Sequence, residues 1–214
     1  MIVTIGIDPG KTGAIVVLAD GCSPLVAERA PVVGKKKWPL AQSMNALVAP
    51  FGASDMSGRR SPLLRMSTQL VELANADSDD DGEDEEFWEL LDTIESIITR
   101  NPVKAALAAL ELQSGRGGEA QGSVLTTGVG FGLWLGILTS NMVPVEEVAA
   151  SRWTRALGCS GVKQELRKAA HVALCQKLLP ELDLLPGSTR KPHDGLADAG
   201  LLALYAYRQV VGSN

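Results

Sequence analysis

The first twenty residues place the strongest limits on the fold. Two short apolar runs, "IVTIGI" at 2–7 and "GAIVVLA" at 13–19, are separated by little more than Asp8-Pro9-Gly10. Short runs rich in β-branched residues predict strands, and the brief connection with Pro and Gly predicts a hairpin. The chain therefore begins with an antiparallel pair whose first strand ends in one carboxylate, Asp8.

The rest of the chain changes from strands to an alternation of helices and strands. We expect further strands at 25–33, 103–112 and 143–148, and helices at 85–100, 130–141, 151–158, 161–179 and 193–211. Three initial strands are typical of an antiparallel meander, and the later alternation adds parallel strands. We predict an α/β fold, a mixed five-stranded sheet with helices on both faces.

Composition is typical of one globular domain over 1–214. Apolar residues make up 45% of the 214 positions and charged residues 21%. The longest apolar stretch, at 128–138, is shorter than the roughly 18 residues of a membrane span, so we expect no membrane partner. No signal or transit peptide is visible before the first strand, although one could have been removed. Three cysteines without CxxC spacing predict a reducing compartment and no zinc site.

Charge is distributed very unevenly. The run "DSDDDGEDEE" at 77–86 holds eight acids, which more than account for the net charge of −5. We read 34–100 as a divergent insertion whose acidic segment, about 75–86, is mobile, as blocks of like charge often are. The stretch 151–180 is basic, and its predicted helix at 161–179 turns one face inward (Leu166, Ala170, Ala173, Leu174 and Leu178) and leaves three bases outside (Lys163, Arg167 and Lys168). Such a face could meet phosphates or simply be solvated.

Four acids stand in otherwise apolar surroundings. Asp8 ends the first strand, Glu111 ends the strand predicted at 103–112, and Asp194 and Asp198 share one face of the last helix. A buried carboxylate is costly unless it is paired or binds a metal, and oxygen ligands suit Mg²⁺. Two such ions can assist phosphodiester hydrolysis. The alternative is structural, with Asp8 in a turn and Asp194 at a helix N-terminus.

A phosphate-binding loop is a third interpretation of the first turn. The motif GxxxxGK[ST] requires glycine five residues before Gly10, and that position is Ile5. An acid-Gly-Thr hairpin also binds phosphate in actin-type ATPases, but those chains need a second lobe for which 214 residues leave little room. Both phosphate-loop interpretations are therefore disfavoured.

Four segments together resemble the RuvC-like Holliday junction resolvases. They are "GIDPGKTGAIVVL", "LELQSGRGGEAQGSVLTTGVGFGLWLGIL", "VPVEEVAASRWTRALG" and "KPHDGLADAGLLALYAY". The branch they match best is the monokaryotic-chloroplast type, found in phages and chloroplasts. The resemblance covers roughly 1–20 and 104–208 and leaves 34–100 uncovered.

The resemblance implies an RNase H-like fold and a homodimer that nicks four-way DNA junctions symmetrically. Mg²⁺ is the implied cofactor, with Mn²⁺ able to substitute, and the products carry 5′-phosphate and 3′-hydroxyl ends. Carried over residue by residue, the catalytic and metal-binding acids are Asp8, Glu111, Asp194 and Asp198. His193 stands where the family often has histidine, and we read it as a helix-start residue.

The resemblance also assigns DNA contacts. Within the Gly-rich loop at 113–123, "GGEAQGS" matches the loop that enters the junction in this family, and the candidates in the wider loop are Arg116, Gln121 and Ser123. With the family in view, the basic stretch supplies phosphate contacts that give position and salt dependence; its candidates are Arg155, Lys163, Arg167 and Lys168. Trp153 could belong to the core or to a contact, whereas Trp134 is expected in the core.

Two other functions stay open from the sequence. One is a nucleic-acid-binding module on the same fold without catalysis; the other is an RNase H or an exonuclease. Exonucleases of this fold usually carry D-x-E on the first strand, whereas Asp8 is followed by Pro9-Gly10. For localisation, we expect the chloroplast nucleoid or stroma if the source is a plant or alga, and otherwise the cytoplasm of a phage host or bacterium.

Overall fold

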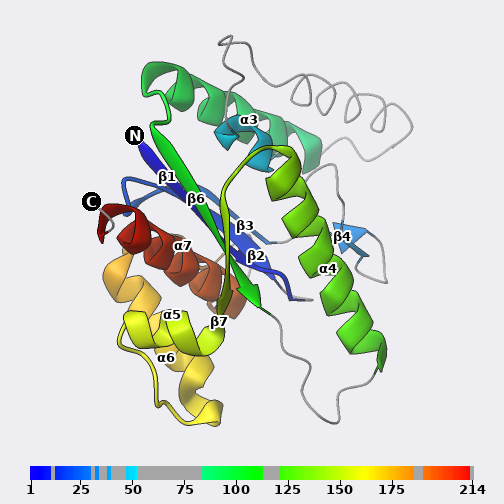
Figure 1. The fold of residues 1–214 in the computed structure, drawn as a ribbon, viewed down its shortest axis with the longest axis vertical. Coiled ribbons are helices and arrows are strands. Elements are labelled where there is room, and N and C mark those ends of the chain that lie inside the picture. The colour runs from blue at the N-terminus through cyan, green and yellow to red at the C-terminus, as the bar shows by residue number, and fades with distance from the viewer. Residues whose placement is uncertain are drawn as a thin grey trace.

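The computed structural model is organised around one mixed sheet (Figure 1). The structure describes residues 1–10, 13–29, 32–33, 38–39, 47–52, 83–112, 121–185 and 190–212. The sheet has five strands in the order β3-β2-β1-β6-β7. Their bounds are Ile2–Asp8 for β1, Ala14–Ala19 for β2, Ser23–Arg29 for β3, Ala105–Leu112 for β6 and Val145–Ala149 for β7.

The first three strands pair antiparallel, and the two later strands are added in parallel. β2 pairs antiparallel with β1 and with β3, whereas β6 runs parallel to β1 and β7 runs parallel to β6. The predicted mixed five-stranded sheet, with a meander followed by parallel additions, is therefore confirmed. A second, two-stranded sheet of β4 (Val32–Val33) and β5 (Trp38–Pro39) was not predicted.

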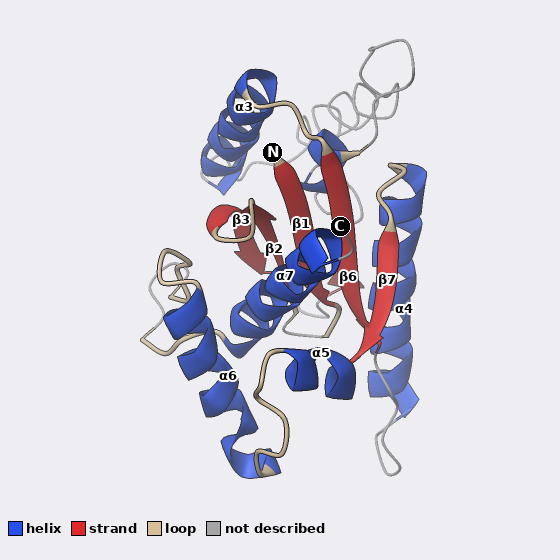
Figure 2. Ribbon diagram, turned by 60° about the vertical axis from the view of Figure 1, so that its left-hand side comes forward, coloured by secondary structure: helices blue, strands red, loops and turns tan. Residues whose placement is uncertain are grey.

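Helices cover both faces of the large sheet (Figures 1 and 2). One face carries α3 (Glu83–Arg100), α4 (Gln121–Ser140) and the short 3₁₀ helix η1 (Ala49–Phe51), around a core that includes Ile94 and Trp134. The other face carries α5 (Ala150–Ala156), α6 (Gln164–Leu178) and α7 (Asp194–Gly212), around a core that includes Trp153. Both tryptophans are 1% exposed, so Trp134 lies in the core as predicted and Trp153 is not a surface contact.

The side chains of β1 alternate between these two cores. Val3, Ile5 and Ile7 pack toward α3 and α4. The alternate residues face α7, and there Gly6 lets the helix come close, because a Cβ on Gly6 would lie 1.9 Å from the Ala199 carbonyl oxygen. The strand therefore presents its last residue, Asp8, on the α7 face.

Three predicted boundaries or faces were wrong. α4 begins at Gln121 instead of 130, so Gln121 and Ser123 belong to a helix and not to a loop. The third strand ends at Arg29, and 32–33 pair with 38–39 instead. On α6 the fully buried residues are His171 and Cys175. Leu174 and Leu178, expected inward, do pack partly buried against the same core, whereas Leu166 is 60% exposed in the first turn.

The acidic segment is described only in part. Residues 75–82 lie outside the described residues, whereas 83–86 form the start of α3, two residues earlier than predicted. Among the described helices, none is both long and apolar enough to span a membrane.

Candidate active site

Asp8 and Glu111 lie side by side at the ends of neighbouring strands. The parallel register pairs Ile7 of β1 with Leu110 of β6, and continuing it by one residue brings Asp8 beside Glu111. Both then point to the α7 face, since Ile7 and Leu110 pack into the opposite core. The Gly10 N–H donates to Asp8 Oδ1 at 3.0 Å, which fixes this carboxylate at the start of the turn.

The N-terminal turns of α7 bring the other two acids to the same place. Asp194 is the first residue of α7 and Asp198 lies one turn later. His193 caps this helix, because the Leu196 N–H donates to His193 Nδ1 at 3.1 Å. His193 therefore sits at the helix start, as predicted from the sequence.

The charges of the acids act on one another. Burial raises the pKa of Glu111 to about 8, and the negative charges of Asp8 and Asp198 add to the rise. Burial likewise raises the pKa of Asp8 to about 6; the Gly10 hydrogen bond opposes this rise, and the charges of Asp198 and Asp194 reinforce it. The four acids predicted from the sequence therefore form one electrostatically coupled cluster, drawn from β1, β6 and α7.

Two bases on α6 reach into this cluster. Lys168 Nζ makes an ion pair with Asp194 Oδ2, and His171 Nδ1 lies 2.6 Å from Asp198 Oδ1. Burial raises the pKa of Asp194, but the hydrogen bond and charge of Lys168 outweigh it, so the net pKa is lowered. Lys168, predicted as a phosphate contact, thus turns toward an acid in this structure.

The donor set suits a hard divalent cation. Carboxylate oxygens are the ligands that Mg²⁺ prefers, and a cation between Asp8 and Glu111 would relieve the burial and repulsion that raise their pKa values. Among the described residues, no group of three His, Cys, Asp or Glu side chains stands in an ion-holding arrangement. Asp194 and Asp198 are engaged by Lys168 and His171 instead.

The basic side chains predicted to contact DNA lie mostly on α5 and α6. Three of the predicted contacts, Arg155, Lys163 and Arg167, are exposed on or beside these helices, and the charge of Arg167 lowers the pKa of Glu111. Gln121 and Ser123 occupy the first turn of α4. Arg116 lies outside the described residues.

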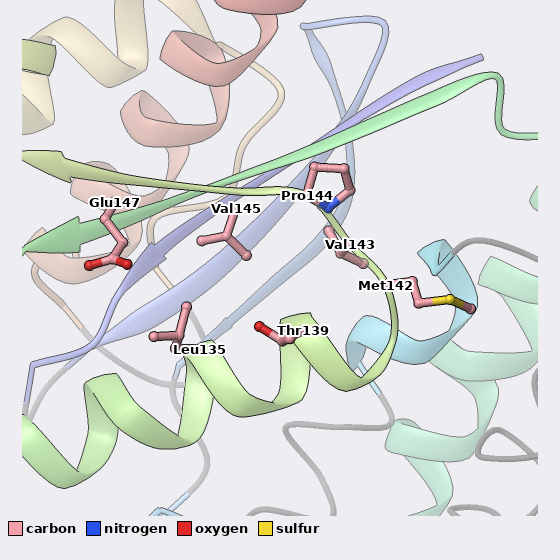
Figure 3. Close-up of a pocket in the computed structure, with 7 residues that line it drawn as sticks. All are labelled: Leu135, Thr139, Met142, Val143, Pro144, Val145 and Glu147. Atoms are coloured by element: carbon pink, nitrogen blue, oxygen red, sulfur yellow. The ribbon is translucent and has the colours of Figure 1, made fainter.

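A groove opens on the other face of the sheet, between the end of α4 and β7 (Figure 3). Its lining includes Leu135, Met142 and Val145, with Glu147 as its one acid. Val145 packs into the core beneath α3 and α4, so this groove lies across the sheet from Asp8 and Glu111. It shares no residue with the acid cluster.

Sequence reasoning missed the partners that come from α5 and α6. His171 and Trp153 are both buried, and their rings touch edge to face. One signal was available, since His171 and Cys175 are four residues apart and share a helix face. Choosing that face in place of the one through Leu166 would have placed a histidine inside the core.

Comparison with solved structures finds the same fold in RuvC. The structure of Thermus thermophilus RuvC in complex with a Holliday junction substrate matches with a TM-score of 0.51 and 16% identity, over 100% of this chain and 98% of that one. A second Thermus thermophilus RuvC structure has a TM-score of 0.43 and 19% identity, over 99% and 97%. No family model matches the chain, and no curated protein matches it. The first comparison establishes the RuvC-type, RNase H-like fold.

Proposed function

We propose that the protein is a metal-dependent endonuclease that resolves four-way DNA junctions. The observation that carries the proposal is the placement of Asp8 and Glu111 on adjacent parallel strands, with Asp198 of α7 close enough to raise the pKa of Glu111. Ligands in sheets of this kind bind beyond the carboxyl ends of the strands, which is where these acids stand. The fold shared with RuvC, whose solved complex contains a Holliday junction, supports the choice of substrate.

The residues divide into two groups by role. Asp8, Glu111, Asp194 and Asp198 would hold Mg²⁺, or Mn²⁺ in its place. When bound, the metal supplies Lewis-acid stabilisation of the negative charge that develops on the phosphoryl oxygens. Lys163, Arg167 and Arg155 attract the DNA backbone through its phosphates.

Lys168 has two possible partners in such a site. In this structure it pairs with Asp194, and this hydrogen bond raises the pKa of the lysine. Its side chain is 78% exposed, so it can rotate away when phosphate arrives. Release of Asp194 would then complete the set of four acids.

The test is nicking of a labelled four-way junction. Wild type should cut with Mg²⁺ and not with EDTA, and Asp8→Asn should bind the junction normally while losing at least about 100-fold in rate. An RNA–DNA hybrid and a single-stranded end, run beside the junction, distinguish a resolvase from an RNase H or an exonuclease. Wild-type nicking by Asp8→Asn would refute the site.

A non-catalytic junction-binding module is the alternative. It is favoured by one observation, that Lys168 pairs with Asp194 and no ion-holding group of three stands ready among the described side chains. This alternative predicts tight junction binding without nicking at micromolar protein and millimolar Mg²⁺. Any Mg²⁺-dependent nicking that Asp8→Asn abolishes would exclude it.

A homodimer is the proposed assembly, because two sites related by a twofold axis could cut opposing strands of a symmetric junction. One face of α4 offers a surface for it: Gly128, Gly132 and Gly136 recur every fourth residue, and among the described residues a Cβ on any of them would meet no atom within 4 Å. The compartment, organellar or cytoplasmic, stays a prediction from the resemblance.

A further inference from the structure

His171 and Trp153 form a buried pair behind the acid cluster. His171 comes from α6 and is 4% exposed, and Trp153 comes from α5 and is 1% exposed. Their ring centroids lie 5.0 Å apart with the planes at 60°. Edge-to-face contact of this kind is the preferred geometry of aromatic pairs, so the indole restricts the orientation of the imidazole.

The imidazole donates to the carboxylate of Asp198. His171 Nδ1 lies 2.6 Å from Asp198 Oδ1, and a carboxylate oxygen can only accept, so the proton belongs on Nδ1. The other nitrogen, Nε2, is buried without a hydrogen-bond partner among the described residues. The ring therefore has one polar contact, and that contact is with an acid of the proposed site.

We propose that His171, held in orientation by Trp153, is a positioning residue that fixes the Asp198 carboxylate beside Asp8 and Glu111. This inference rests on the proposed function, since it assigns Asp198 to the metal site. The hydrogen bond occupies one carboxylate oxygen and restricts rotation of the group. Carboxylates that ligate metals are commonly oriented by such hydrogen bonds from outside the ligand set.

Trp153 also lies near Glu111, the acid of β6. Its buried indole N–H has no well-formed hydrogen bond to any described residue, yet it acts on Glu111, where it opposes the rise in pKa that burial produces. One indole thus lies against the imidazole and close to Glu111. The pair connects the acid of β6 with the acid of α7 and explains why a tryptophan and a histidine are buried here.

Three substitutions of His171 separate positioning from packing. The side-chain amide of His171→Asn places an N–H where Nδ1 stands, whereas the longer His171→Gln places it nearer Nε2, and His171→Leu keeps only the packing. His171→Leu and His171→Gln should each raise the Mg²⁺ concentration for half-maximal nicking by about 10- to 100-fold. In His171→Asn this concentration should stay near that of wild type. Gln176→Ala, at an exposed position of the same helix, is the control.

Two further measurements need no catalysis. In metal-free wild type, ¹⁵N NMR of the histidine ring should show the proton on Nδ1. The Mg²⁺-induced rise in the midpoint of thermal unfolding, measured without DNA, should shrink in His171→Leu and recover in His171→Asn. The NMR measurement remains decisive even if a variant fails to fold.

Different results would overturn the positioning role of His171 and the proposed nuclease function. If Asp8→Asn is inactive but His171→Leu keeps the wild-type Mg²⁺ midpoint, the site stands and the positioning role is wrong. An unprotonated Nδ1 in the NMR spectrum would also overturn it. If wild type never nicks DNA, the function fails, and the Mg²⁺-induced stabilisation alone then decides whether His171 supports a metal site.

Discussion

Gly6 of β1 lies directly against Ala199 of α7, with no room for a side chain between them. A Cβ on Gly6 would stand 1.9 Å from the Ala199 carbonyl oxygen and 2.4 Å from Ala203 N. Both neighbours are helix backbone, so neither can yield without a shift of α7. Because α7 carries Asp198, this close approach is what brings the helix acid to the strand acids.

Gly6→Ala should therefore damage both stability and the proposed activity. We expect the free energy of unfolding to fall by about 3 kcal/mol or more, at or beyond the upper end of overpacking effects, because the clash involves backbone. Urea unfolding measures this loss. Where the variant remains folded, nicking should fall more than junction binding. The acids of the cluster move apart, whereas the basic side chains of α6 keep their places.

Two other glycines provide matched controls for this substitution. At Gly200 a Cβ would meet the Leu182 Cδ2 methyl at 2.6 Å, and a side-chain end can move, so Gly200→Ala should cost less. At Gly128 no described residue comes within 4 Å of a Cβ, so Gly128→Ala should stabilise α4 by up to about 1 kcal/mol. Equal losses at Gly6 and Gly200 would contradict the close-approach argument.

The raised pKa values of Asp8 and Glu111 predict how stability depends on pH without metal. Burial, with repulsion from nearby acids, raises these pKa values from 3.8 to about 6 and from 4.5 to about 8. The folded state therefore binds more protons than the unfolded state between about pH 4 and pH 8, so stability falls as pH rises through that window. The slope should reach at most about 1.4 kcal/mol per pH unit for each group.

Thermal unfolding in EDTA at pH 5, 6.5 and 8 tests this dependence. Glu111→Gln should flatten the upper part of the curve, and Asp8→Asn should flatten the lower part. Added Mg²⁺ should recover stability most at pH 8, where both carboxylates are charged. A pH profile identical in wild type and Glu111→Gln would contradict the clustering of the acids.

The sheet and the four acids could be predicted from the sequence because their signals are local. β-branched runs mark β1 and β2, and the acids interrupt apolar stretches at strand ends or at the start of α7. Charge in an apolar context is costly, so such positions stand out without any knowledge of the fold.

The partners of these acids could not be predicted in the same way. His171, Trp153 and Lys168 reach the acids only because α5 and α6 pack beside α7, and the sequence does not specify which face of α6 turns inward. Leu166 turned the predicted inward face away from His171, because an apolar residue in a first turn can remain exposed beyond the edge of the core. Similarly, glycines at 122, 128 and 130 hid the start of α4.

The basic face of α6 should bind junction DNA through phosphates. Arg167→Gln removes one exposed charge near Glu111, so affinity should fall similarly for every junction sequence, and the slope of log affinity against log salt should decrease by about 1. Fluorescence anisotropy at several salt concentrations measures both effects.

Lys177→Gln is the charge-matched control for this experiment. It makes the same change in net charge in the last turn of α6, far from the acids, and should alter the slope less. A sequence-dependent loss with Arg167→Gln would point to base contacts instead of phosphate contacts.

The open glycine face of α4 predicts where two copies would meet. Gly132 lies at the middle of this face, and Leu125, one turn before Gly128, is 63% exposed. Gly132→Arg should leave the folded monomer intact, because no described residue lies within 4 Å of a Cβ there, and should shift a dimer to monomer by burying a charge and bulk in the contact. Sedimentation equilibrium of wild type and variant measures the dissociation constant.

Gln176→Arg, which adds the same charge on α6, should leave the dimer unchanged. If the Gly132→Arg protein dimerises like wild type, the dimer uses another face; if it becomes monomeric, its nicks should appear in one strand of the junction at a time.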